Sequence, residues 1–394
     1  MKRIGMGIVG AGFVGPHHVD AVRRLGFVDV VGVAGSTEAS AKKKAEAIGA
    51  RKAFGSYEAL LDDPEVQVVH NATPNYLHYP VNAAALARGK HVVSDKPLAM
   101  SAKEAKQLVE QARKAGVVNA VTFNYRGNPL VQQARLAVKR GDLGKPNFLV
   151  GYYLQDWLIK DTDYSWRLEP DKGGASSAVA DIGSHWCDLV QHVTGLRIES
   201  VLADLATVVP IRYKPHADRV AFTGSQATEG EPFSMRSEDL ATILVRFEGN
   251  AKGVVSVGQV CAGHKNDLWF EVSGATGSLR WRQEAQNELW IGRRDEPNMM
   301  LAKDPSLLTP EARGYARLPG GHQEGWPDAF LNVLRDVYSA VARQKAGEPV
   351  GVAVYPTFED GYRVACLIDA VLESHHRGGV WTAVQQPALA GVAR

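Results

Sequence analysis

Residues 4–15 read IGMGIVGAGFVG, and this stretch decides the fold of the first part of the 394-residue chain. Its first half is apolar and predicts a buried strand, while residues 17–25 have helical spacing and predict a helix. The motif G-x-G-x-x-G stands between them. Gly10 permits a tight turn, Gly12 lets backbone amides approach a pyrophosphate, and Gly15 allows the helix to pack closely on the strand.

The start of this helix also attracts anions, because its first N–H groups lack partners and carry the positive end of the helix dipole. Glycine by itself is a weak signal, since the chain has 39 glycines. The order of strand, glycine loop and helix makes the signal specific. We therefore predict a dinucleotide site whose loop consists of Gly10, Gly12, Phe13, Val14 and Gly15.

The composition is that of an ordinary globular protein, with 45% hydrophobic and 22% charged residues. The chain has 45 Lys and Arg residues and 43 Asp and Glu residues, so its net charge is +2. This near-balance does not indicate a basic surface that would bind nucleic acid or an anionic membrane. No apolar run approaches the roughly 20 residues that span a bilayer. The three cysteines are scattered and lack C-x-x-C spacing, which predicts a reducing cytoplasm and no zinc module or disulfide framework.

The first 125 residues alternate β-branched runs with alanine-rich helical stretches, a pattern typical of a doubly wound parallel sheet. We predict a Rossmann-type α/β domain over 1–125. Further strands are expected at 28–34, 66–71, 91–94 and 117–123, and further helices at 40–48, 79–88, 102–115 and 129–140.

From about residue 148 the chain changes to strand-like runs joined by short turns. We predict a second, α+β domain over 126–394, built on a large, mostly antiparallel open sheet. Its strands are expected at 148–153, 198–208, 240–247, 253–260, 268–273 and 278–282, with helices at 182–193, 327–346 and 364–374. The last helix is expected to return toward the first domain, and the polar stretch 214–239 is predicted as a surface loop.

Polar residues follow two neighbouring strands of the predicted parallel sheet. Thr73-Pro74-Asn75 follows the strand at 66–71, and Asp95-Lys96-Pro97 follows the strand at 91–94. Ligands of doubly wound sheets bind outside these strand ends. Lys96 lies between a strand end and a proline, so its backbone is constrained and its X-Pro bond is a candidate for the cis form. The alternative is an ordinary solvated lysine in a loop.

Near the middle of the chain, Asp181, His185 and Asp188 lie on one face if this stretch is helical. A carboxylate that tunes and orients an imidazole on a rigid helix suits proton transfer. Alternatively, Asp181 caps the helix and His185 is a satisfied core histidine. A metal site has little support and none is predicted, because neither H-E-x-x-H nor cysteine spacing is present.

Candidate substrate contacts follow the fifth and sixth strands and one later loop. Aromatic faces beside polar donors suit a sugar ring, with its C–H faces and hydroxyls, although each of these residues could equally be core or surface. The glycine-rich loop 320–326 is of the kind that closes on a cleft. The candidates are Asn124, Tyr125, Arg126, Trp157, Trp166, Arg167 and His322.

The choice between NAD and NADP stays open. The second strand ends in Val33-Ala34-Gly35-Ser36-Thr37, without the acid that usually holds the ribose diol in NAD enzymes. Ser36 and Thr37, with Lys42 or Lys43, could instead accept a 2′-phosphate, although such lysines commonly lie on a solvated helix face.

Taken in order, these motifs resemble the glucose–fructose oxidoreductase / inositol dehydrogenase family (Gfo/Idh/MocA). The resemblance covers most of the chain and rests on four motifs. They are the N-terminal G-x-G-x-x-G, Thr73-Pro74-Asn75 with His78, Gly89-Lys90-His91-Val92-Val93 leading to Lys96-Pro97, and Asp181-x-Gly-x-His185-x-x-Asp188. It implies that Thr73, Pro74, Asn75, His78, Asp95 and Lys96 lie at the cofactor. Asp95 replaces the glutamate usual in the family, which puts its contact with the cofactor ribose in doubt.

The resemblance also implies catalytic roles for Lys96, Asp181 and His185. In the oxidation direction, His185 would take the proton of a sugar or polyol hydroxyl, with an unperturbed pKa near ~6.5 well suited to this task. Lys96 would stabilise the charge developing on that oxygen, and Asp181 would orient the substrate or His185. The expected activity is therefore that of an NAD(P)-dependent dehydrogenase or reductase.

Two other functions fit the same scaffold: a glycosidase that uses NAD for transient oxidation, and a non-catalytic NAD(P)-binding sensor. An open sheet also exposes a face that another subunit can cover. We therefore expect a homo-oligomer, and the resemblance implies a homodimer or homotetramer formed through this sheet.

Overall fold

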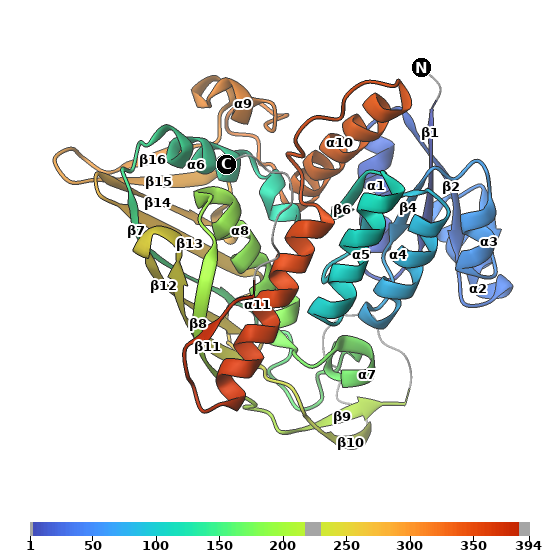
Figure 1. The fold of residues 1–394 in the computed structure, drawn as a ribbon, viewed down its shortest axis with the longest axis horizontal. Helices are drawn as coiled ribbons and strands as arrows, with labels where there is room; N and C mark the ends of the chain where they lie inside the picture. Colours follow the sequence, from blue (N-terminus) through green and yellow to red (C-terminus); the bar gives the residue numbers. More distant parts are fainter. Residues whose placement is uncertain (1–2, 217–229, 386–394) are drawn as a thin grey trace.

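The computed structural model describes residues 3–216 and 230–385 and arranges them as two sheets with helices around and between them (Figure 1). The first sheet is parallel, with strand order β3-β2-β1-β4-β5-β6. Its strands are β1 (Ile4–Val9), β2 (Val28–Ala34), β3 (Lys52–Phe54), β4 (Val68–Asn71), β5 (His91–Ser94) and β6 (Asn119–Val121). The helices between them are α1 (Gly15–Arg24), α2 (Glu38–Ile48), α3 (Tyr57–Asp62), α4 (His78–Ala87) and α5 (Ala102–Ala115).

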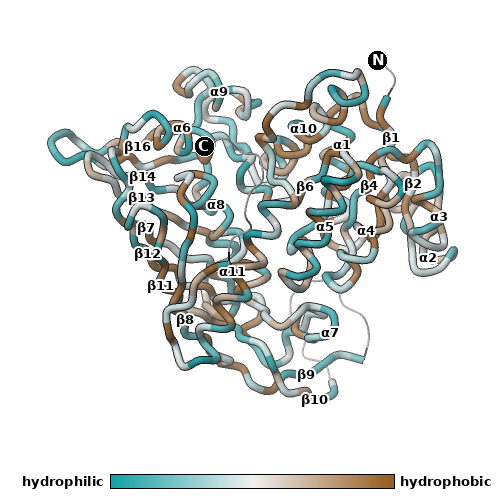
Figure 2. Tube along the Cα trace, viewed as in Figure 1, coloured by the Kyte–Doolittle hydropathy of each residue, from teal (hydrophilic) through white to brown (hydrophobic). Residues whose placement is uncertain are grey.

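The strands at the centre of this sheet are buried over their whole length, because helices cover both faces. Figure 2 shows hydrophobic stretches along β1, β2 and β4. Helix ends follow local chemistry: the Ser101 hydroxyl accepts the N–H of Glu104 at the start of α5, and Gly116 ends this helix in the left-handed conformation. The predicted α/β domain is therefore confirmed in class and strand direction.

The second sheet has nine strands in the order β16-β15-β14-β13-β7-β12-β11-β8-β17. All neighbours are antiparallel except β7 and β12, which run parallel. The strands are β7 (Pro146–Leu154), β8 (Ile198–Ala206), β11 (Leu240–Phe247), β12 (Lys252–Gly258), β13 (Asp267–Gly274), β14 (Gly277–Arg282), β15 (Glu288–Arg293), β16 (Met299–Ala302) and β17 (Thr382–Ala383). This is the mixed, mostly antiparallel open sheet that the sequence predicts.

Helices of the second half contact this sheet and lie between it and the first domain (Figure 1). They are α6 (Pro129–Arg140) and α8 (Ser184–Thr194), with α11 (Phe358–His376) beside them and the short α7 (Pro170–Gly173) and α9 (Pro310–Arg313) nearby. Helix α11 begins six residues before the predicted start and packs on α5. Helix α10 (Trp326–Lys345) packs on α1 and shares a core with the strands of the first sheet.

The predicted surface loop at 214–239 is wrong in part. The segments β9 (Ile211–Pro215) and β10 (Gly230–Ser234) pair as a small antiparallel sheet, and residues 217–229 lie outside the described residues. Glu238 and Asp239 are buried, because their carboxylates accept backbone N–H groups at 177 and 179 and at 208 and 209. Within 3–216 and 230–385, no helix is both long and apolar enough to cross a membrane.

Candidate active site

A cavity of about 500 Å³ opens between the carboxyl edge of the parallel sheet and the second sheet. Segments that are distant in sequence form it, among them the glycine loop, the loop after β5, the residues after β6, the end of β7, the turn before α8 and the start of α10. Side chains that line it are Phe13, Val14, His17, Asp95, Lys96, Thr122, Asn124, Tyr125, Tyr153, Gln155, Arg167, Asp181, Ile182, His185, Lys265, Asn266, Trp326, Pro327 and Phe330. The three predicted catalytic residues are among them.

Lys96 and Asp181 form the central pair of this cavity. Lys96 Nζ donates to Asp181 Oδ1 at 2.7 Å and to the Asp181 carbonyl oxygen at 2.6 Å. Both side chains are largely buried. The Lys96–Pro97 peptide bond is cis, as the sequence suggested. These contacts use two of the three protons of the ammonium group, so one remains for a ligand in the cavity.

Two further side chains hold the Asp181 carboxylate. Gln259 Nε2 donates to Asp181 Oδ2 at 2.8 Å, and Arg167 Nε lies 3.3 Å from Oδ1. Burial alone would raise the pKa of Asp181, but the charges of Lys96 and then Arg167 outweigh burial and hold this pKa well below its usual range. Asp181 is therefore ionised near neutral pH and keeps Lys96 in place.

His185 is the unpaired member of the site. Neither of its ring nitrogens has a hydrogen-bond partner among the described residues, and Nδ1 is buried. The ring packs edge-on against Tyr125, with centroids 5.1 Å apart, and against Phe123 at 5.7 Å. Burial and, after it, the charge of Lys96 lower the pKa of His185 to about 3. The expectation of an unperturbed histidine is thus wrong, and His185 is neutral near pH 7.

The predicted direct acid–imidazole pair is also absent among the described contacts. The reason is local: residues Val179–Gly183 form a π-helical turn before α8 begins at Ser184, which changes the spacing of side chains around the helix. Asp181 therefore faces Lys96 and does not cap the helix. Glu238 does so instead, since its carboxylate accepts the backbone N–H groups of residues 177 and 179.

Arg126 is predicted to contact the substrate, but it does not line the central cavity. Its guanidinium hydrogen-bonds the carboxylate of Asp188, with Nε to Oδ2 at 2.8 Å, and lies 3.2 Å from Asp360. All of these contacts are outside the central cavity. Asp188 likewise does not line the central cavity, and it is the buried partner of Arg126.

The wall opposite Lys96 is a hydrogen-bonded network. Asn266 Oδ1 accepts from Tyr153 Oη at 2.5 Å and from Gln155 Nε2 at 2.9 Å, and Asn266 Nδ2 donates to Tyr125 Oη at 3.1 Å. Asn124 also lines the cavity, and its buried Nδ2 has no partner among the described residues. A polar ligand can satisfy this donor, so Asn124 and Tyr125 lie where the sequence predicted.

Two predicted tryptophan contacts do not line the cavity. Trp157 lies behind the wall and donates from Nε1 to Gln155 Oε1 at 2.8 Å. The ring of Trp166 stacks under the Arg167 guanidinium at 4.6 Å. Arg167 itself reaches the cavity, so the tryptophans support side chains that line the site.

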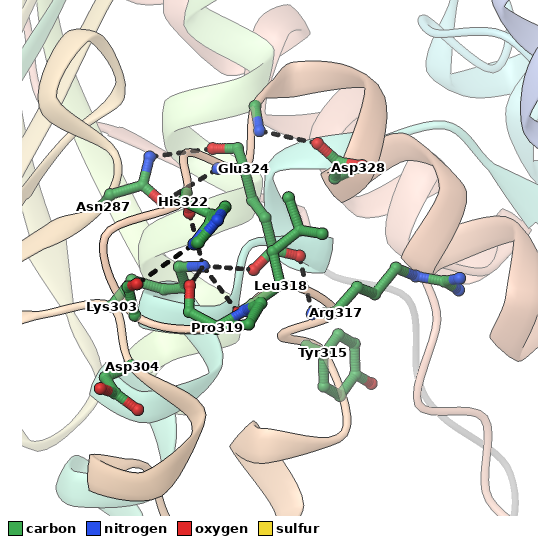
Figure 3. Close-up of polar contacts among 12 residues, drawn as sticks. Asn287, Lys303, Asp304, Tyr315, Arg317, Leu318, Pro319, His322, Glu324 and Asp328 are labelled. Carbon is green, nitrogen blue, oxygen red and sulfur yellow. Dashed lines mark hydrogen bonds and ion pairs between the residues drawn. The ribbon is translucent and has the colours of Figure 1, made fainter.

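His322 does not line the central cavity either, because the loop that carries it is tied down elsewhere (Figure 3). The buried Lys303 Nζ donates to the carbonyl oxygens of Leu318, Pro319 and His322 and pairs with Glu324 at 2.8 Å. The imidazole of His322 is exposed. Trp326, at the start of α10, is the residue of this region that reaches the cavity.

The glycine loop has the geometry that a dinucleotide needs. Gly10 has φ +87°, and a Cβ there would lie 2.5 Å from the Ala72 carbonyl oxygen. A Cβ on Gly15 would lie 2.9 Å from the Gly10 carbonyl oxygen, whereas one on Gly12 would meet nothing within 4 Å. The protein itself therefore requires Gly10 and Gly15, and the open space at Gly12 fits the approach of a pyrophosphate.

The polar residues after β4 hold loops at the sheet edge. Thr73 Oγ1 donates to Asn71 Oδ1 at 2.7 Å, and Asn75 Nδ2 donates to the Gly173 carbonyl oxygen at 2.8 Å. The nitrogens of buried His78 lie against the carbonyl oxygens of Pro97 and Thr73, at 2.5 and 2.9 Å. None of these side chains, nor Pro74, lines the central cavity. Their contacts position the Lys96 loop.

The remaining residues that the sequence predicts at the cofactor are Asp95 and those at the end of β2. Asp95 lines the cavity and accepts the Thr122 hydroxyl at 2.5 Å. Thr37 Oγ1 accepts the N–H of Ser40 and so caps α2, while Ser36 is exposed. Lys42 lies 3.3 Å from Glu38 on the exposed face of that helix.

Several residues of the site carry no sequence signal. Gln259 and Asn266 lie at strand ends of the second sheet, outside any motif, and Tyr153 is one of many strand aromatics. Only the register of β7, β12 and β13 brings them to the cavity. In the part of the chain that the structure describes, no group of three or more His, Cys, Asp or Glu side chains could hold a metal ion.

Known proteins share this architecture. Residues 4–123 match the family model described as the oxidoreductase family, NAD-binding Rossmann fold, and residues 131–280 match the GFO/IDH/MocA C-terminal domain. Over 398 residues the chain is 29% identical to levoglucosan dehydrogenase of Pseudarthrobacter phenanthrenivorans, covering 95% of this chain and 96% of that protein.

Solved structures agree. Levoglucosan dehydrogenase in complex with NADH and L-sorbose has a TM-score of 0.87 at 28% identity, covering 98% of this chain and 100% of that chain. An inositol dehydrogenase homologue from Azotobacter vinelandii, complexed with NAD+, has a TM-score of 0.87 at 25% identity and covers 97% of both chains.

Proposed function

Because the chain belongs to the Gfo/Idh/MocA family of NAD(P)-dependent oxidoreductases, we propose that its own substrate is a sugar, an anhydrosugar or a cyclic polyol. It transfers a hydride between the cofactor and one hydroxyl-bearing carbon of that substrate. The observation that carries this proposal is the meeting of Lys96, Asp181 and His185 in one cavity beside the glycine loop.

In the oxidation direction, His185 accepts the proton of the substrate hydroxyl. Its lone pair is available because burial and the charge of Lys96 keep the ring neutral. Lys96 donates its remaining proton to the same oxygen and stabilises the negative charge that develops there. Asp181 positions Lys96 through the contact at 2.7 Å.

The cofactor supplies the hydride acceptor or donor when it is bound. The glycine loop would hold its pyrophosphate, with Gly12 leaving the space for its approach, and Asp95 lies beside Lys96 at the carboxyl edge of the sheet. We infer that NAD is preferred over NADP. Lys42 is paired with Glu38, and the negative charge of Glu38 disfavours a 2′-phosphate. The solved relatives carry NADH or NAD+.

The substrate wall favours a polyhydroxylated ring. Asn124, Gln155 and Asn266 offer amide groups, and the Tyr125 and Tyr153 rings offer flat apolar faces.

We also propose a cytoplasmic location, in line with three free cysteines, and a homo-oligomer formed through the second sheet.

The test is a screen of NAD and NADP, each with inositols, aldoses, anhydrosugars and glycosides as substrates. The absorbance of the reduced nicotinamide measures turnover. We expect Lys96→Met and His185→Asn to lower kcat by about 10²- to 10⁴-fold, because each removes a group that acts on the reacting oxygen. Both should bind NAD like the wild type, and the exposed Lys139→Met is the matched control. Unchanged turnover in the Lys96 or His185 variant would reject the assignment.

A further inference from the structure

A second cavity, of about 700 Å³, lies behind the proposed active site. Residues of helices α5, α6, α8 and α11 line it, together with residues 352–357 before α11. Figure 1 shows where these helices lie. The two cavities share a wall but no lining residue. Tyr125 lines the active site, whereas the next residue, Arg126, lines the second cavity. On α8, His185 lines the active site and Asp188 lines the second cavity.

The second cavity has an excess of positive charge. Its lining contains five arginines and three carboxylates, namely Arg113, Arg126, Arg135, Arg197, Arg363, Asp188, Glu359 and Asp360. The carboxylates are already engaged: Arg113 pairs with Glu359 at 2.6 Å, Arg126 with Asp188, and Arg363 with Asp360 at 3.1 Å. His192, also in the lining, is neutral near pH 7 because burial lowers its pKa well below 6.5.

Two of the arginines have no partner. The guanidinium groups of Arg135 and Arg197 make no hydrogen bond or ion pair with any described residue, although both side chains are half-buried. Burial lowers the pKa of both groups, as expected for cations that have lost water without gaining a counter-charge. An unpaired cation in such a place costs stability unless an anion joins it.

A third donor without a partner lines the same cavity. The Tyr355 hydroxyl also lines the cavity and has no hydrogen-bond partner among the described residues. Guanidinium forks match phosphate oxygens, and the volume is within the about 300–1,000 Å³ range of small-molecule sites. The surplus of two positive charges equals the charge of about −1.5 to −2 that a phosphomonoester carries at neutral pH.

We propose that this cavity binds a small molecule with a phosphate group, which pairs with the free guanidinium groups of Arg135 and Arg197. The site is separate from the glycine loop, where the pyrophosphate of the cofactor is expected. The inference therefore does not rest on the proposed reaction.

The test is a calorimetric titration of inorganic phosphate into the NAD-saturated enzyme, so that the cofactor site is already filled. Chloride at the same ionic strength is the reference. We expect saturable binding by the wild type and a loss of about tenfold or more in affinity for Arg135→Met and Arg197→Met, because each removes a charge-assisted hydrogen bond. Arg140→Met is the matched control: Arg140 lies on the same helix, is exposed and pairs with Asp142 outside the cavity.

The variants are expected to fold, because each removes a cation that has no protein partner. Without phosphate, the melting temperatures of Arg135→Met and Arg197→Met should equal or exceed that of the wild type. Phosphate binding that these variants retain in full would overturn the proposal. So would an absence of saturation of the wild type at millimolar phosphate, or tighter binding of succinate than of phosphate. Each result is readable whether or not the enzyme oxidises a sugar.

Discussion

At the scale of single residues, the two leading glycines of the loop have different physical roles. We expect Gly10→Ala to destabilise the fold by more than about 1 kcal/mol, because φ is +87° and the new Cβ would lie 2.5 Å from a backbone oxygen. Gly12→Ala should leave the melting temperature unchanged, since its Cβ meets no protein atom within 4 Å, and should weaken NAD binding. Thermal melts and NAD titrations of both variants check this. Equal loss of stability in the two would contradict it.

The pH profile of the reaction tests the state of His185. Its pKa is lowered to about 3 by burial and by Lys96, so the ring stays neutral throughout the range of about pH 5 to 8. We expect kcat/KM for oxidation to show no fall on the acid side near pH 6.5. An acid limb centred near 6.5 that disappears in His185→Asn would show that the ring titrates like a free histidine.

The same residues show what sequence can predict of a site. Lys96, Asp181 and His185 are recognisable because motif order and strand-end position place them on the ligand side. The pKa of His185 is not recognisable, since it depends on burial under Tyr125 and Phe123. Arg126 also follows a strand end, but its guanidinium pairs with the buried carboxylate of Asp188 on α8. Such pairings arise only when distant segments meet.

At the scale of elements, periodicity predicts the long, regular pieces and misses those made by tertiary contacts. The central strands and α5 appear close to their expected bounds. Strand β3 has three residues and no apolar alternation of its own, so pairing with β2 creates it. The π-helical turn before α8 is likewise invisible in sequence, because no residue preference marks it.

A buried polar chain joins three elements of the first domain. His18 Nδ1 on α1 lies 2.8 Å from His70 Nδ1 on β4, and His70 Nε2 lies 2.9 Å from Tyr338 Oη on α10. We expect Tyr338→Phe to lower the free energy of unfolding by about 1–3 kcal/mol, because it leaves a buried ring nitrogen without its partner. Urea unfolding measures this, with the exposed Tyr76→Phe as the control.

The same chain makes stability sensitive to acid. Burial lowers the pKa of His18 to about 4 and that of His70 well below 6.5. Below about pH 6.5 the unfolded chain therefore binds more protons than the folded chain. The stabilisation is complete above about pH 6.5 and is lost as pH falls toward 4, so the urea midpoint should decrease over this interval. A midpoint independent of pH there would contradict the neutral burial of these rings.

At the scale of the whole molecule, the family, the two-sheet architecture and the NAD-binding first domain were all predictable, because each leaves its own local signal. The way in which the two sheets meet was not predictable. Helix α10 returns 311 residues after Gly15, the last glycine of the loop, to share the core of the first sheet and to bring Trp326 to the cavity. The central cavity depends on this folding-back, whereas the second cavity depends on the return of α11 and the residues just before it, and neither is encoded in any single segment.

The last prediction concerns the face of the second sheet that α6, α8 and α11 leave uncovered. One cross-strand row on it consists of Leu202, Leu244, Val254 and Val150, all at least partly exposed although apolar. A single subunit has no element in its described residues to bury this row, and a second copy of the same face would remove it from water. We expect the wild type to be an oligomer in analytical ultracentrifugation and Leu244→Asp to shift it to monomers that still bind NAD. Leu307 is an exposed leucine in the turn after β16 and outside this row, so Leu307→Asp should keep the wild-type mass. A monomeric wild type, or an unchanged mass for Leu244→Asp, would mean that the apolar row is not an interface.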